Sequence, residues 1–143
     1  MSHTHRIAWC AGFFDGEGYV TIQKRKAKAP NGKTYTGYYL RIGINHVALE
    51  PLYEIQKYLG GKVVLFTGVT GNRHPRHQWC LNCAEAAEGL KTLLPYLINK
   101  DEVAKIGLEF QDTMRADKKE TPLETVIYRQ LLREKVMSIN KMD

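Results

Sequence analysis

The spacing of apolar residues changes once within the first 30 positions. In residues 5–16 the apolar side chains recur at intervals of three and four, which is the period of an amphipathic helix. From Tyr19 the period is two, because Val20 and Ile22 alternate with polar side chains as in a half-buried strand. The pattern therefore predicts a helix that leads into a β-strand.

A second alternating run predicts the partner of that strand. Leu40, Ile42 and Ile44 occupy one face, and the residues between them are polar or glycine. The Pro-Asn-Gly-Lys segment at 30–33 is typical of a turn, because glycine accepts positive φ and asparagine tolerates it. We expect the two runs to form a long hairpin with a polar, basic outer face.

The next part of the chain repeats the order of one helix and two strands. A helix is predicted from near Pro51 to Gly60, since proline is tolerated at a helix start and glycine is typical of a helix end. Residues 62–69 and 76–82 are predicted to form a second hairpin, with a Gly-Asn turn at 71–72.

Three helices are predicted after the second hairpin. Apolar residues at helical spacing indicate helices at 84–98 and 101–115. In the last helix, Thr121 would cap the first turn, Pro122 would take the first helical position and Glu124 would close a capping box. Since no long linker or internal repeat divides the sequence, we expect one α+β domain over residues 1–143.

Composition excludes several classes of protein. The chain has 143 residues, and 43% of them are apolar, which is sufficient for a packed core. No purely apolar run, such as residues 63–66, approaches the roughly 20 residues of a membrane helix. The polar start does not resemble a signal peptide, and three cysteines are too few for a disulfide framework. We expect a soluble, intracellular protein with no membrane partner.

Positive charge is concentrated in the first half of the chain. Residues 1–77 carry 11 Lys and Arg against 4 Asp and Glu, whereas residues 78–143 carry 10 against 11. The densest basic stretch is Lys-Arg-Lys-Ala-Lys at 24–28. Basic residues beside Tyr, Gln and Asn are typical of nucleic-acid binding, although an ordinary solvated surface has a similar composition.

The end of the first predicted helix has features with chemical consequences. The helix ends at Gly16, which leaves the Glu17 carboxylate at its C-terminal tip just before the basic strand. Ala8, Gly12 and Gly16 are spaced four apart, so one helix stripe has almost no side chains and a second helix can approach closely. If a second copy is related by a two-fold axis, both Glu17 side chains meet near that axis. Alternatively, the acidic residues at this helix end face solvent.

Two carboxylates at adjoining helix ends need a counter-charge, because they repel each other and the negative ends of the helix dipoles. A hard divalent cation such as Mg²⁺ binds oxygen ligands and still holds water and a phosphate oxygen. The paired arrangement therefore favours Mg²⁺ as the cofactor, and no small-molecule cofactor is indicated.

The sequence Ala-Gly-Phe-Phe-Asp-Gly-Glu-Gly at 11–18 resembles the motif of the LAGLIDADG homing endonucleases, in the variant that ends Asp-Gly-Glu-Gly. Cys10 stands at the first motif position in place of Leu, a change that affects packing more than chemistry. The predicted α-β-β-α-β-β-α order also resembles the family's core. That core implies a four-stranded antiparallel saddle sheet over about 5–115, with C-terminal helices over about 101–140. A single motif implies a homodimer.

The resemblance implies roles for individual residues of a catalytic centre. Glu17 matches the metal-binding acid of the family, and Gly16 matches the residue whose backbone carbonyl adds a ligand. The segment 94–100 resembles the stretch that carries the active-site lysine, so Lys100 is expected to stabilise charge on the scissile phosphate. Asn45 lies where the family often has a polar side chain that orders the attacking water. A base contact or a capping role is equally compatible with its position.

The resemblance also implies a surface for double-stranded DNA. Polar strand residues are expected to read bases in the major groove, whereas Lys26 and Lys28 would contact phosphates. The expected DNA-contacting residues are Thr21, Gln23, Arg25, Lys26, Lys28, Tyr39, Arg41, Asn45, Arg73, Arg76 and Gln78. The expected homodimer interface contains Ala8, Ala11 and Gly12.

Two other interpretations concern particular side chains. His74, His77, Cys80 and Cys83 are competent zinc ligands, but a strand would point Cys80 and Cys83 to opposite faces. Trp9 invites a stacking role on bases, although packing of the first helix is the simpler expectation.

These features together predict a homing endonuclease. The resemblance implies that such an enzyme makes a Mg²⁺-dependent double-strand break with short 3′ overhangs, and a homodimer would need a long, roughly palindromic DNA target. The break would promote copying of the protein's own intron, intein or free-standing gene. The alternative function on the same fold is an RNA maturase or a DNA-binding regulator that does not cut.

Overall fold

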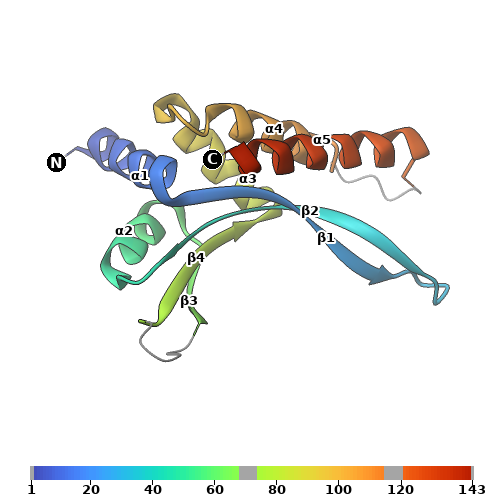
Figure 1. Ribbon diagram of the computed structural model, residues 1–143, viewed down its shortest axis with the longest axis horizontal. Helices are drawn as coiled ribbons and strands as arrows, with labels where there is room; N and C mark the ends of the chain where they lie inside the picture. Colours follow the sequence, from blue (N-terminus) through green and yellow to red (C-terminus); the bar gives the residue numbers. More distant parts are fainter. Residues whose placement is uncertain (1, 68–73, 115–120, 143) are drawn as a thin grey trace.

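Four antiparallel strands form a curved sheet, and helices cover one of its two faces (Figure 1). The computed structural model describes residues 2–67, 74–114 and 121–142. The elements are α1 (His3–Glu17), β1 (Gly18–Lys28), β2 (Thr34–His46), α2 (Leu49–Leu59), β3 (Lys62–Thr67), β4 (Arg76–Asn82), α3 (Cys83–Leu93), the 3₁₀ turn η1 (Leu94–Tyr96), α4 (Asp101–Asp112) and α5 (Leu123–Met142). The α+β class and the predicted order of the core elements are confirmed.

The sheet has the order β1-β2-β4-β3, and its neighbouring strands are all antiparallel. β1 pairs with β2 along its whole length. The predicted turn closes this hairpin, because the Ala29 N–H donates to the Lys33 carbonyl at 2.8 Å and the Lys33 N–H donates to the Asn31 side chain at 3.0 Å. The hairpin of β1 and β2 forms one arm of an arch, and β3 and β4 form the other (Figure 1).

The core lies between the sheet and the helices, and the predicted alternation determines which strand residues enter it. Val20 and Ile22 of β1 point into it, as do the alternate apolar residues of β2. Full burial of one such side chain contributes roughly 1.5–3 kcal/mol. The largest fully buried side chains are Trp79, Phe14, Phe110, Leu40, Ile42, Ile44, Leu52, Ile55, Leu90, Leu93, Leu132 and Val20.

The C-terminal helix α5 lies over the outer edge of β1, which is an edge strand of the sheet. Arg133 Nε donates to the carbonyl of Ile22 at 3.0 Å, and Asn140 Nδ2 donates to the carbonyl of Val20 at 3.1 Å. These bonds satisfy backbone acceptors that an edge strand otherwise leaves open to another chain. None of the described helices, α5 included, has the length and hydropathy of a membrane span.

Helix ends in the second half of the chain differ from the sequence prediction. The helix predicted over 84–98 ends at Leu93 and continues only as η1, which contains Pro95. Proline has no backbone N–H to donate to the carbonyl four residues before it, so the regular α-helix does not continue through Pro95. The helix predicted over 101–115 ends at Asp112. At the last helix, the carbonyl of Pro122 accepts from Val126, so the helix starts one residue later than predicted. The predicted turn at 71–72 lies outside the described residues.

The two tryptophans provide a test of this packing. Trp79 is fully buried and its Nε1 donates to the Gly60 carbonyl at 2.7 Å, whereas Trp9 is 41% exposed. We expect Trp79→Phe to lower the free energy of unfolding by about 2 kcal/mol, because it leaves a cavity and an unpaired carbonyl. The matched variant Trp9→Phe should change it by less than about 0.5 kcal/mol. Urea unfolding measures both, and equal losses would contradict the placement of Trp79.

Candidate active centre and nucleic-acid interface

Glu17 ends α1, and the chain passes from it into β1 without a loop (Figure 1). The connection depends on Gly18, because a Cβ at this position would lie 2.4 Å from Phe14 Cδ1 and 2.7 Å from the Phe14 carbonyl oxygen. A larger residue would therefore push the strand away from the helix. The direct connection leaves the Glu17 side chain exposed at the point where the sheet begins.

The exposed side of α1 carries almost no side chains, and we refer to it as the bare side of α1. A Cβ built on Gly12 or Gly16 would meet nothing within 4 Å, and both residues are exposed. Ala8, one helix turn before Gly12, is half-buried. Ala11 is fully buried inside the chain, so its predicted place in a homodimer interface is wrong. Its position on the inner side of the helix makes it part of the core.

Trp9 also departs from the sequence expectation. It lies at the surface, where its ring stacks on Phe13 with a centroid distance of 5.4 Å. Phe13 in turn meets His46 edge to face at 5.6 Å. The expected packing of Trp9 into the core is therefore wrong, and an aromatic row borders the bare side of α1 instead.

Asp15 joins the tip of α1 to the start of α4. Its carboxylate accepts N–H groups from Ile98, Asn99 and Lys100 at 2.8–3.0 Å. Lys100 Nζ donates in return to the backbone carbonyl of Asp15 at 2.9 Å. The structure thus brings the predicted Lys100 to the helix end that carries Glu17. This role of Asp15 has no signal in the sequence, because its partners lie more than 80 positions away.

The electrostatics of this contact are favourable to the ionised carboxyl. Burial alone would raise the pKa of Asp15, but the three N–H groups and the nearby Lys100 charge lower it below its usual value. Lys100 itself is only 9% exposed, and its ammonium group has two further N–H donors besides the one bound to Asp15. A buried, oriented ammonium group of this kind can bind an anion.

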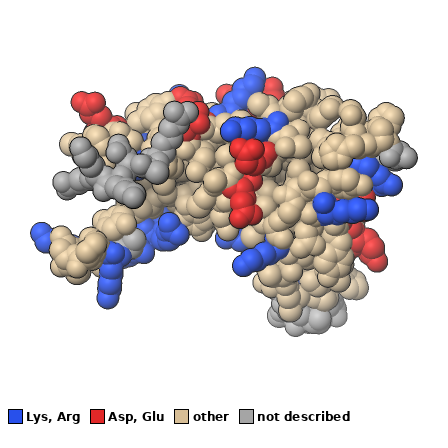
Figure 2. Space-filling model, turned by 180° about the vertical axis from the view of Figure 1, so that it is seen from behind, with Lys and Arg blue, Asp and Glu red and all other residues tan. Residues whose placement is uncertain are grey.

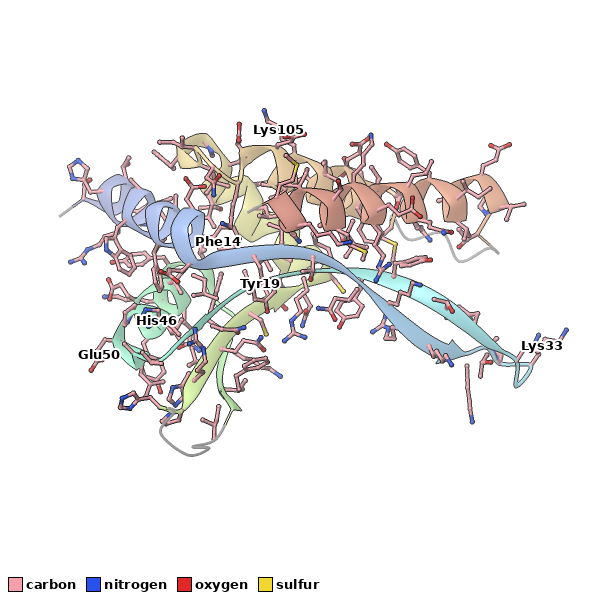
Figure 3. The ribbon with its side chains drawn as sticks, in the orientation of Figure 1. Phe14, Tyr19, Lys33, His46, Glu50 and Lys105 are labelled. Carbon is pink, nitrogen blue, oxygen red and sulfur yellow. The ribbon has the colours of Figure 1, made fainter. Side chains whose placement is uncertain are left out.

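A hydrogen-bonded cluster occupies the centre of the open sheet face, near the top of the arch, where Figure 3 shows Tyr19. Gln78 Oε1 accepts from Arg41 Nη2 at 2.7 Å, and Gln78 Nε2 donates to the Tyr19 hydroxyl at 2.9 Å and to Asn45 Oδ1 at 3.0 Å. Arg41 Nη2 also donates to Cys80 Sγ at 3.4 Å. We refer to Tyr19, Arg41, Asn45, Gln78 and Cys80 as the central cluster.

The central cluster corrects the prediction for Gln78. Its side chain is on the expected sheet face, but it is only 6% exposed and its amide is engaged by other side chains. Gly43 makes this possible, because a Cβ there would lie 2.5 Å from the Tyr19 hydroxyl and 2.7 Å from the Trp79 carbonyl. The missing side chain lets the ring of Tyr19 lie across β2 and reach Gln78 on β4.

The outer part of the β1–β2 hairpin is basic and exposed. Lys24, Arg25, Lys26 and Lys28 are all exposed, and blue side chains project from this arm and along the underside of the arch in Figure 2. Figure 3 shows Lys33 at the hairpin tip. Among these four residues, Arg25 shares the strand face of Tyr19, whereas the three lysines alternate with it and lie on the other strand face, beyond the part that the helices cover.

Other predicted DNA-contacting residues lie between the central cluster and the hairpin arm, where longer hydrogen bonds hold them. Gln23 Nε2 donates to Thr21 Oγ1 at 3.3 Å, and Tyr39 donates to Gln23 Oε1 at 3.4 Å. The guanidinium of Arg25 lies 5.2 Å from the centre of the Tyr39 ring. Arg76 is exposed on β4. Arg73 lies outside the described residues.

The four side chains considered as zinc ligands do not assemble into a site. Within residues 2–67, 74–114 and 121–142, no three His, Cys, Asp or Glu side chains are placed to hold a metal ion. Cys80 belongs to the central cluster, and Cys83 starts α3 with φ 56°. The third cysteine, Cys10, is in the core, where burial raises the pKa of its thiol to about 11.

The sequence profile of the family described as LAGLIDADG endonuclease matches residues 10–116, more than half of the chain. The chain therefore belongs to the LAGLIDADG endonuclease family, and the resemblance drawn from residues 11–18 is confirmed. No curated protein matches the chain.

Solved structures of homing endonucleases share this fold. I-CvuI, in complex with the I-CreI target DNA in 2 mM Mg with the DNA not cleaved, has a TM-score of 0.75 and 23% identity, covering 96% of this chain and 83% of that chain. The archaeal intron-encoded I-Vdi141I, complexed with DNA, has a TM-score of 0.77 and 12% identity, covering 96% and 86%. I-SmaMI, bound to uncleavable DNA, has a TM-score of 0.65 and 19% identity, covering 89% of this chain and 42% of that chain.

The hydrogen bonds of Asp15 give a direct prediction. We expect Asp15→Asn to lower the free energy of unfolding by about 2 kcal/mol, because an amide has one acceptor oxygen and presents its own N–H₂ to the backbone donors. Amide hydrogen exchange at 98–100 should accelerate in the variant. The control is Glu17→Gln two positions away, which changes an exposed side chain and should alter stability by less than about 0.5 kcal/mol. Unchanged exchange at 98–100 would contradict the role given to Asp15.

Proposed function

We propose that the chain is a homodimeric, divalent-metal-dependent DNA endonuclease in which Glu17 and its copy hold the metal ions. The observation that carries the proposal is the position of Glu17. Its exposed carboxylate ends a helix with a bare side, lies two residues from the carbonyl that holds Lys100, and stands where a sheet with a basic arm begins.

The donors at this position suit a hard cation. Glu17 supplies carboxylate oxygens and Gly16 a backbone carbonyl, which are the ligand types that Mg²⁺ prefers. One chain does not provide a complete set of ligands among its described residues, so the proposed site takes Glu17 from two copies. A bound divalent cation would lower the pKa of its water and stabilise the leaving 3′ oxygen. I-CvuI has been crystallised with DNA in the presence of Mg and of Ca.

The protein's own residues would orient the scissile phosphate. Lys100 has two N–H donors left for a phosphate oxygen after its bond to Asp15, and the Asp15 contacts keep it in place. Asn45 gives its Oδ1 to Gln78, so its Nδ2 remains to hold a water molecule or a base. These roles of Lys100 and Asn45 follow the family resemblance.

A second copy is proposed to dock on the bare side of α1. Ala8, Gly12 and Gly16 allow the two helix backbones to approach closely, which would bring the two Glu17 carboxylates together. The match to less than half of I-SmaMI supports this assembly, because one copy of this chain corresponds to one part of that longer protein.

The open sheet face is proposed to lie in the major groove of one half-site. β1 has 11 residues and therefore spans about 36 Å, the length of roughly ten base pairs. The exposed lysines of the hairpin arm would contact phosphates, and two-fold symmetry would make the target roughly palindromic. The resulting double-strand break would promote copying of the intron, intein or free-standing gene that encodes the protein.

Removing the metal-binding carboxylate tests the enzymatic proposal. Glu17→Gln should abolish cleavage of a duplex that carries the uninterrupted insertion site of the protein's own gene, and EDTA should do the same to the wild-type chain. DNA affinity should change by less than about tenfold, since Glu17 lies where β1 begins and not on the basic part of the β1–β2 hairpin. Glu85→Gln, which changes an exposed glutamate on α3, is the matched control. Undiminished cutting by Glu17→Gln would contradict the proposal, and binding without cutting by the wild-type chain would favour a maturase or regulator.

Gly12 provides a test of the proposed assembly. Gly12→Leu should weaken the dimer by about tenfold or more, because the added side chain keeps the two helix backbones apart. Light scattering over a dilution series gives the dissociation constant. Lys105→Leu places the same side chain on α4, which lies on the helical side of the molecule (Figure 3), and should leave the dimer intact. A Gly12→Leu protein that remains as dimeric as Lys105→Leu would place the interface elsewhere.

A further inference from the structure

The orientation of the Gln78 amide is fixed by its partners. Arg41 can only donate hydrogen bonds, so the group that faces it at 2.7 Å must be the carbonyl oxygen of Gln78. The amide nitrogen therefore points the other way, where it lies 2.9 Å from the Tyr19 hydroxyl and 3.0 Å from Asn45 Oδ1. Gln78 thus donates both of its N–H groups to neighbouring oxygens.

This arrangement determines what the neighbouring side chains can offer to a ligand. The Tyr19 hydroxyl accepts from Gln78 and keeps its own proton for donation, and burial raises the pKa of this phenol, which preserves the proton. Asn45 has its oxygen turned toward Gln78, so its Nδ2 donors remain. Arg41 adds donors of its own. The central cluster therefore presents donors to the open face of the sheet.

Neighbouring side chains also hold the Arg41 guanidinium in one position. Its Nη2 is bound by both Gln78 and Cys80, and its Nε is buried without a hydrogen-bond partner among the described residues. Side chains fixed before a ligand arrives lose less conformational entropy on binding and tolerate less variation in the ligand. The lysines of the hairpin arm are exposed and belong to no such cluster.

We propose that Gln78 sets the hydrogen-bond polarity of the central cluster so that each subunit selects guanine at the base pairs that face Arg41 and Asn45. The proposal rests on the proposed DNA-binding function. In the major groove guanine presents two adjacent acceptors, N7 and O6, whereas cytosine presents a donor and adenine one of each. Thymine presents an acceptor beside a methyl group. Only guanine offers two adjacent acceptors to a surface made of donors.

The experiment is a selection of bound duplexes from a library randomised across both half-sites, in EDTA so that no strand is cut. The wild-type chain should show a preference of about tenfold or more for guanine at central positions of each half-site. In Gln78→Met, which has a similar shape but no amide, that preference should fall below about threefold while preferences elsewhere stay the same.

Gln78→Glu should have a different and more specific effect. A carboxylate only accepts, so Tyr19 and Asn45 would turn their donors toward it and Asn45 Oδ1 would face the groove. The base preferred opposite Asn45 should then change from guanine to one with a donor, cytosine or adenine. Lys26→Met is the control for charge, because it should weaken binding to all sequences alike and reduce its salt dependence.

The outcomes separate this inference from the proposed function. If the wild-type chain enriches no sequence, sequence-specific DNA binding is contradicted. If it enriches defined sequences but both Gln78 variants keep the wild-type preferences, or the central preference is not guanine, the role of Gln78 alone is overturned. Should the Gln78 variants not fold, Tyr19→Phe and Arg41→Lys test the same cluster, since each should reduce the guanine preference at least threefold.

Discussion

The carboxylate of Asp15 makes the contacts on which the geometry of the proposed active centre depends. It binds three consecutive N–H groups at 98–100 and so ties the end of α1 to the start of α4. Because Gly18 lets β1 begin directly after Glu17, the same point also fixes where the sheet starts. These contacts therefore connect Glu17, Lys100 and the first residues of β1. The proposed catalytic residues and the proposed DNA-binding sheet are held in fixed positions relative to each other.

The sheet divides the proposed task of DNA recognition between two regions. Four exposed basic residues, Lys24, Arg25, Lys26 and Lys28, lie on the hairpin arm, where they would attract the phosphate backbone irrespective of sequence. The proposed hydrogen-bond selectivity would lie in the central cluster, whose members hold one another in place through Gln78. The second region is closer in the chain to Glu17, since Tyr19 follows it by two residues. Selectivity would therefore be strictest near the place of cutting, and affinity would come mostly from the arm.

Local patterns in the sequence predicted most of the fold and part of the site. Strand alternation and turn chemistry depend on neighbouring residues, and the motif at 11–18 is continuous, so both can be recognised without a structure. Asp15, Gln78 and Trp9 could not be interpreted correctly in this way. The partners of Asp15 and Gln78 are 33 to 85 positions distant, and the exposure of Trp9 depends on how α1 sits on the sheet. Ala11 and Gly12 are adjacent in the motif, yet only the packed helix shows which of them faces outward.

In the proposed enzyme, one active unit takes Glu17 from two copies of the chain. The most direct measurement mixes wild-type and Glu17→Gln chains, allows their subunits to exchange, and follows double-strand cleavage at constant total concentration. We expect cleavage to fall with the square of the wild-type fraction, to about a quarter at equal amounts, because only pairs of wild-type subunits cut both strands. A linear fall, to about half at equal amounts, would mean that each chain acts alone and would contradict a shared active unit.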